Sequence, residues 1–186
     1  MQSVYAMIQS HNDDIVKEEK FVKHSIKKMF DLYVLLLQLL VEVQKLAEQK
    51  QEISKKKYLA TKEDLSPNRK FVENKLIKKL AESNSLLLHM EAHKLNNWLL
   101  DDEYVKIIWE KLQKSDLFSR YLNTIEDSYK VDKSFVIDFF RDIIAPNQKL
   151  FDYFEDQNIT WVDDIPFVNT WVIRSLNKQN SNSSWY

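Results

Sequence analysis

Glycine is absent from this chain of 186 residues, although its usual frequency of about 7% would give about 13. Glycine supplies positive φ angles and lets the backbone approach a ligand closely. A dinucleotide fingerprint, a Walker A loop, a nucleophile elbow and an EF-hand loop all depend on it, so these sites are excluded. No segment shows sustained polar and apolar alternation bounded by turn residues. We therefore predict an all-α fold, a multi-helix bundle with one long central helix.

The strongest local pattern is a heptad rhythm, in which apolar residues recur at alternating spacings of four and three. It predicts one helix over residues 14–57, about 65 Å long at about 1.5 Å per residue. Between Leu32 and Val43 almost every face is apolar, so we expect other helices to cover this part. The heptad residues are Val22, Ile26, Met29, Tyr33, Leu36, Leu40, Val43 and Ala47.

Breaks and cap residues divide the rest of the chain into shorter helices. Asp132 is expected to cap a helix that Pro146 ends, and Asp164 to cap the last helix with Pro166 in its first turn. Further helices are expected at residues 2–9, after the break at 66–68 as far as 82, and at 85–95, 101–114, 116–122 and 147–155.

These elements group into three regions. Residues 1–125 form an N-terminal helical region, residues 126–178 a C-terminal helical unit, and residues 179–186 a frayed tail. In the last helix we expect Phe167, Trp171 and Leu176 to face inward together.

Composition indicates a folded cytoplasmic protein. Hydrophobic residues make up 44% of the chain, enough for a packed core. Cysteine is absent, which excludes disulfides and thiolate metal sites, and the first residues lack the order of a signal peptide. The longest apolar run, Leu32 to Val43, is shorter than the ~20 residues that a membrane-spanning helix needs.

The residues usual in catalysis form no recognisable set. His89 and His93 are one helical turn apart, but the zincin order is absent and no third ligand is suggested, so we interpret them as solvent-facing. Paired aspartates at 13–14, 101–102 and 163–164 stand at expected helix starts, where acidic residues cap and complement the dipole. We predict no catalytic residue, no metal and no cofactor, and hence no enzyme.

Basic residues are concentrated in the first half of the chain. Residues 1–99 carry 17 basic and 13 acidic side chains, whereas residues 100–186 carry 10 and 15. This asymmetry fits a polyanionic partner and a solvated surface about equally well. The candidates for nucleic-acid contact are Lys20, Lys23, Lys27, Lys28, Lys55 to Lys57, Arg69, Lys70, Lys75, Lys78 and Lys79.

Several segments together resemble one bacterial family. QSVYA at 2–6 and QSHNDD at 9–14 form a Gln-x-x-Tyr element that leads into a polar turn. DLYVLLLQLLVE at 31–42, TKEDLSPN at 61–68 and FVEN at 71–74 follow, and near the end come DKSFVIDFFR at 132–141 and WVDD at 161–164. In this order they resemble the transcription antitermination protein NusB, in its long variant with a helical N-terminal insertion.

The resemblance implies an all-helical RNA-binding factor that pairs with the ribosomal protein NusE and binds the boxA element of nascent RNA. It places Gln2 and Tyr5 on an RNA-facing first helix, although Tyr5 fits a core position equally well. Lys20, Lys23 and Lys27 are the basic residues that we add to this predicted RNA site. The family's arginine-rich start and C-terminal helices are missing, so we expect a chain shortened at both ends.

The alternative is a helical interaction or scaffold domain without RNA affinity. In that case the heptad stripe of the long helix would be the seam of a homo-oligomer.

Overall fold

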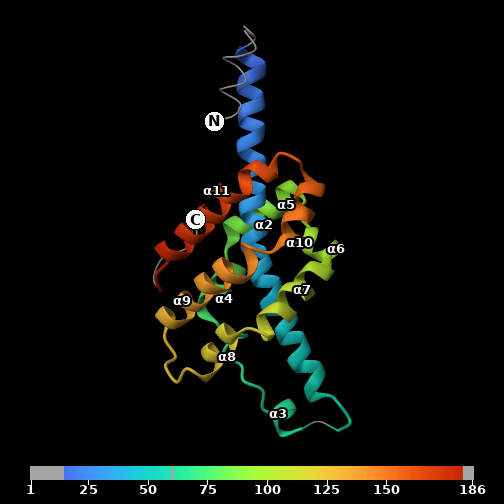
Figure 1. Cartoon of the computed structure of the whole chain (residues 1–186), viewed down its shortest axis with the longest axis vertical. Helices are drawn as coiled ribbons and strands as arrows, with labels where there is room; N and C mark the ends of the chain where they lie inside the picture. Colours follow the sequence, from blue (N-terminus) through green and yellow to red (C-terminus); the bar gives the residue numbers. More distant parts are fainter. Residues whose placement is uncertain (1–14, 60, 182–186) are drawn as a thin grey trace.

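The computed structural model describes residues 15–59 and 61–181, and within these ranges every regular element is helical. The prediction of an all-α bundle is therefore confirmed. Figure 1 shows the long helix α2 (Ile15–Lys55) running the length of the molecule, with the shorter helices packed around its middle. These are α3 (Lys62–Leu65), α4 (Lys75–Ala81), α5 (Asn84–His93), α6 (Asn97–Leu100), α7 (Asp102–Gln113), α8 (Asp116–Asn123), α9 (Tyr129–Phe139), the π-helical turn η1 (Phe140–Ile144), α10 (Gln148–Gln157) and α11 (Trp161–Lys178).

The observed bounds agree well with several predicted ones. Helices α2, α5, α7, α8 and α10 begin and end within two residues of the predicted positions. The short helices α3 and α6 were not predicted, because four residues are too few for a periodic pattern. The helix predicted at residues 2–9 lies outside the described residues.

The middle of α2 is buried on all sides. Residues 31–37 and 39–41 are all buried, and helices α11, α7, α4 and α5 pack against α2. An apolar residue on every face is what such a surrounded helix needs. The N-terminal turns of α2, by contrast, extend beyond the other described helices (Figure 1). We call residues 17–28 the α2 arm.

Most of the heptad stripe packs against other helices of the same chain, so it is not available to pack against a second chain. Its members from Tyr33 to Ala47 are buried by the chain's own helices. Only the stripe residues Val22, Ile26 and Met29 are left exposed or half-buried. A homo-oligomer through the long helix would therefore have to use this N-terminal part.

The chain between Pro67 and Asn74 is not the helix that we predicted, because side chains of α2 bind its backbone. Gln44 is buried, and its Nε2 donates to the carbonyl oxygens of Phe71 at 3.1 Å and Val72 at 3.0 Å. Helix α4 starts only at Lys75, where the side chain of Asn74 accepts hydrogen bonds from the first backbone N–H groups.

The prediction that Asp132 caps a helix is wrong by one turn. Ser128 is the N-cap of α9, and its side chain accepts a hydrogen bond from the N–H of Val131. Asp132 lies inside the first turn and is buried. Its carboxylate does not cap α9 and instead accepts a hydrogen bond from the start of α4.

The last helix also starts a turn earlier than predicted. Helix α11 begins at Trp161, not after Asp164, because the Nε1 of Trp161 donates to the carbonyl oxygen of Lys28 at 2.9 Å and fixes this turn against α2. Phe167 was predicted to face inward but is 58% exposed. The inward residues of α11 are Ile165, Val168, Val172 and Leu176, with Trp171 half-buried.

One hydrophobic core joins both predicted regions. Its members run from Leu32 in α2 to Leu176 in α11. The predicted division near residue 125 stays a prediction, but the two regions share this core. After α11 the backbone carbonyls of Gln179 and Asn180 accept hydrogen bonds from Lys133 and Lys79; residues 182–186 of the predicted tail are not described.

None of the described helices has an apolar stretch long enough to cross a membrane.

Removing side-chain volume from the middle of α2 should destabilise the whole fold. Leu40 is 0% exposed, so we expect Leu40→Ala to lower the free energy of unfolding by about 2–5 kcal/mol. Urea denaturation followed by circular dichroism measures this. Leu99→Ala is the matched control, because Leu99 is 81% exposed. Equal losses in both variants would contradict the central role of α2.

Candidate nucleic-acid interface

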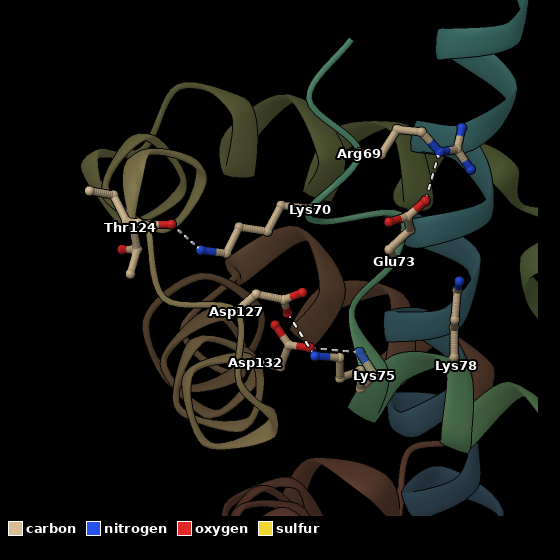
Figure 2. A pocket seen from close by; sticks show the side chains of 9 residues that line it. Arg69, Lys70, Glu73, Lys75, Lys78, Thr124, Asp127 and Asp132 are labelled. Carbon is tan, nitrogen blue, oxygen red and sulfur yellow. Dashed lines mark hydrogen bonds and ion pairs between the residues drawn. The ribbon is translucent and has the colours of Figure 1, made fainter. Parts of the chain in front are cut away.

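All four basic residues between positions 69 and 78 gather around one pocket. The pocket has a volume of about 540 Å³ and opens to solvent between the start of α4 and the loop that joins α8 to α9 (Figure 2). Four cationic and three anionic side chains line it, which leaves one net positive charge. The lining residues are Arg69, Lys70, Glu73, Lys75, Lys78, Thr124, Ile125, Asp127 and Asp132.

A buried hydrogen-bond network fixes one wall of this pocket. Asp132 accepts from the hydroxyl of Tyr121 at 2.7 Å and from the backbone N–H of Lys75 at 2.8 Å. The amide of Asn74 donates to the same hydroxyl at 3.1 Å and to the carbonyl oxygen of Asp132 at 3.3 Å. Helices α4, α8 and α9 are thereby held in one arrangement, with Lys75 at the junction.

The Tyr121 hydroxyl stays protonated in this network. Burial of its side chain raises the pKa of Tyr121 far above the usual value, and the hydrogen bond to Asp132 raises it further. The Nζ of Lys70 lies 5.1 Å from the centre of the Tyr121 ring, within the range of a cation–π contact. The aromatic wall therefore also positions a cation at the pocket.

Arg69 is held by glutamates at one side of the pocket. It contacts Glu73 at 3.0 Å, Glu48 at 3.2 Å and Glu52 at 3.6 Å. Hydrogen bonds to Glu73 and then Glu48 raise the pKa of Arg69 above its usual value. This residue links the 68–74 segment to α2, and its charge is largely compensated.

The positive charges of the three pocket lysines are less fully compensated by carboxylates than the charge of Arg69. Lys70 donates to the carbonyl oxygens of Thr124 and Glu126, which carry no net charge. Lys75 pairs with Asp127 at 2.7 Å, and this hydrogen bond raises the pKa of Lys75 and lowers that of Asp127. Lys78 is exposed and forms no ion pair with the described residues. Phosphate groups are the ligands that such a set of lysines attracts best.

The residues of the predicted RNA site lie elsewhere. Lys20, Lys23 and Lys27 are exposed on the α2 arm, and Gln2 and Tyr5 lie outside the described residues. Lys27 and Glu48, the α2 residue beside Arg69, are about 30 Å apart along the helix axis. The structure therefore does not bring the arm lysines and the pocket together.

His93 is exposed, as predicted, whereas His89 is half-buried. Both point to Asp31, which is buried in α2: the Nε2 of His89 lies 2.9 Å and the Nδ1 of His93 2.5 Å from the Oδ1 of Asp31. Asp31 lies 58 and 62 positions away from them in sequence. No local pattern could reveal the contact.

The paired aspartates that the structure describes are not all caps. Asp101 stands at the N-cap of α7 without a capping side-chain bond and accepts instead from the hydroxyl of Tyr153 at 2.8 Å. Asp163 and Asp164 lie in the first turn of α11, where they complement the helix dipole. The pair at 13–14 is outside the described residues.

Comparisons of the chain with protein-family models, with curated proteins and with solved structures found no match.

The hydroxyl of Tyr121 should matter for stability because it satisfies a buried carboxylate. We expect Tyr121→Phe to lower the free energy of unfolding by about 1–3 kcal/mol and to speed hydrogen exchange at the amide of Lys75. Urea denaturation and amide exchange measure the two effects. Tyr58→Phe, at a fully exposed position, is the control. A neutral Tyr121→Phe variant would show that the network does not hold the pocket.

Proposed function

We propose that this chain is a non-enzymatic RNA-binding factor of transcription antitermination that acts with a ribosomal protein partner. The observation that carries the proposal is the gathering of Lys70, Lys75 and Lys78 around one open pocket on a rigid wall. The resemblance to NusB supplies the class of nucleic acid and the partner, NusE.

The electrostatics of the pocket suit a phosphate backbone. Lys70 and Lys78 form no ion pair with a carboxylate among the described residues. The pair between Lys75 and Asp127 is exposed, and exposed pairs contribute little, so an RNA phosphate can replace Asp127 as the partner of Lys75. Such contacts position RNA without reading its bases.

The α2 arm offers a second set of cations. Lys20, Lys23 and Lys27 recur at spacings of three and four, which places them on one side of the helix. Because about 30 Å separates them from the pocket along α2, one RNA would have to extend along the helix to contact both sets.

RNA affinity should fall when the pocket lysines are removed. We expect K70A/K75A/K78A to weaken binding of a single-stranded boxA-like RNA roughly tenfold or more, and to reduce the slope of log K against log salt by about 2, since each lost phosphate contact on a single strand removes about 0.7. Filter-binding titrations across a salt series, with and without NusE, measure both.

The control is K111A/K114A/K149A, which removes the same charge from exposed positions that do not line the pocket. If the pocket variant binds like the wild type, the pocket is not the interface, and K20A/K23A/K27A then tests the arm. Absence of any salt-dependent binding, with or without NusE, overturns the RNA-binding proposal.

A second candidate function is protein interaction without RNA, and one observation favours it. An apolar groove of about 340 Å³ lies between α2 and α11. Ile26 and Phe167, on its two sides, are 59% and 58% exposed. Apolar side chains exposed together beside a groove are typical of a surface that a partner covers. The groove also includes Met29, Phe30, Thr170, Trp171 and Arg174.

Charge placed in this groove should weaken docking of a protein. We expect Phe167→Glu to lower the affinity for NusE at least tenfold, measured by calorimetry, because a carboxylate would be buried without a partner. Leu88→Glu, at an exposed position of α5, is the control. Unchanged NusE affinity in Phe167→Glu would exclude the groove as the docking surface for NusE. The second function would be favoured by two results together: the wild-type chain does not bind RNA, and it self-associates in a way that Phe167→Glu abolishes.

A further inference from the structure

We propose that Asp31, His89 and His93 form a binding site for a divalent transition-metal ion, with Zn²⁺ as the best fit. This site lies between α2 and α5 and shares no residue with the pocket or the groove. The inference is independent of the proposed RNA-binding function.

The geometry brings three ligand atoms to one point. One ligand atom from each of Asp31, His89 and His93 lies within 4.8 Å of the other two, and the Oδ1 of Asp31 is 2.9 Å from the Nε2 of His89 and 2.5 Å from the Nδ1 of His93. The two imidazole rings are 3.9 Å apart between centroids, since the histidines occupy successive turns of α5. Ligands of a tetrahedral zinc ion with bonds of about 2.0–2.1 Å are about 3.3 Å apart. The distances from Asp31 to the two histidine nitrogens, 2.9 and 2.5 Å, therefore need to lengthen only slightly to admit an ion.

The donor set selects the kind of metal. Two imidazole nitrogens and one carboxylate oxygen suit zinc and neighbouring transition metals, whereas magnesium and calcium prefer oxygen ligands alone. Two histidines four positions apart on one helix are a common pair of zinc ligands. Three protein ligands leave a fourth position, which a water molecule or an external group would take.

The charge balance favours a cation at this point. The side chain of Asp31 is only 3% exposed, and a buried carboxylate is costly without positive charge close to it. Lys28 is 3.4 Å from the other carboxylate oxygen, but its side chain is 40% exposed, so it compensates Asp31 weakly. The two imidazoles contact the other oxygen of this carboxylate. A divalent ion supplies the charge and retains all three side chains as ligands.

The site is fixed on one side and open on the other. Phe30 packs edge-on against His89 with 4.6 Å between ring centroids, which restrains that ring. The side chains of His89 and His93 are 16% and 30% exposed. An ion can therefore enter from solvent on the side of His93.

Titration of the full chain with Zn²⁺ and Co²⁺ tests the proposal. We expect one ion per chain by calorimetry, visible absorption bands of low-coordinate Co²⁺ that Zn²⁺ abolishes, and a rise in Tm of about 5 °C or more at a zinc concentration a hundredfold above Kd. His89→Gln, His93→Gln and Asp31→Asn should each weaken binding at least about tenfold.

His24→Gln is the matched control, because His24 is exposed on the α2 arm, about 10 Å along the helix from Asp31, and is not a member of the cluster; it should bind like the wild type. His93→Gln is the decisive variant, since it changes the most exposed of the three side chains and its fold can be checked by circular dichroism. No Zn²⁺ binding by the wild type overturns the proposal and leaves a hydrogen-bonded cluster. Binding that His93→Gln and His89→Gln leave unchanged overturns it as well.

Discussion

The burial of the middle of α2 is the constraint on which the rest of the structure depends. A helix that is apolar on every face is stable in water only when other helices surround it, and here the surrounding helices come from along the whole remaining chain. Two indole groups help to fix their positions. Trp98 donates to the carbonyl oxygen of Leu35, and Trp161 to that of Lys28. Helices α6 and α11, far apart in sequence, are thereby tied to α2 at two points that are about two turns apart.

Buried polar side chains decide where this packing departs from regular helix. Gln44 binds the carbonyl groups of the 68–74 segment, and Asp132 binds the start of α4. Each would be costly to bury without these bonds. The pocket exists because the 68–74 segment is held in a non-helical path, which brings Arg69 and Lys70 beside the loop after α8. The hydrogen bonds that satisfy buried polar side chains thus also position the charged side chains of Arg69 and Lys70 at the surface.

The sequence predicts the elements whose signals are local and misses the contacts that are not. The heptad rhythm predicts α2 to within two residues, and Asn147 marks the start of α10 correctly. Asp132 has the local signature of a cap, but Ser128 lies one turn earlier and takes that role. The lysines of the pocket are evident as a basic cluster, whereas Tyr121 and Asn74 carry no signal of their partnership with Asp132. The partnership of Asp31 with two histidines is hidden for the same reason.

The absence of glycine shapes how the helices end. Side chains of serine, threonine and asparagine cap the starts of several helices, so those ends need no unusual backbone. At the other end of α5 a left-handed residue is needed, a position that glycine usually fills. Lys94 takes it at φ 55°, the one positive φ among the described residues. The N–H of the next residue, Leu95, then donates a hydrogen bond to the carbonyl oxygen of Met90. Helix α5 therefore ends directly after His93. A lysine in this strained conformation costs about 1 kcal/mol or more, and the bonds that α5 makes to Asp31 help to offset that cost.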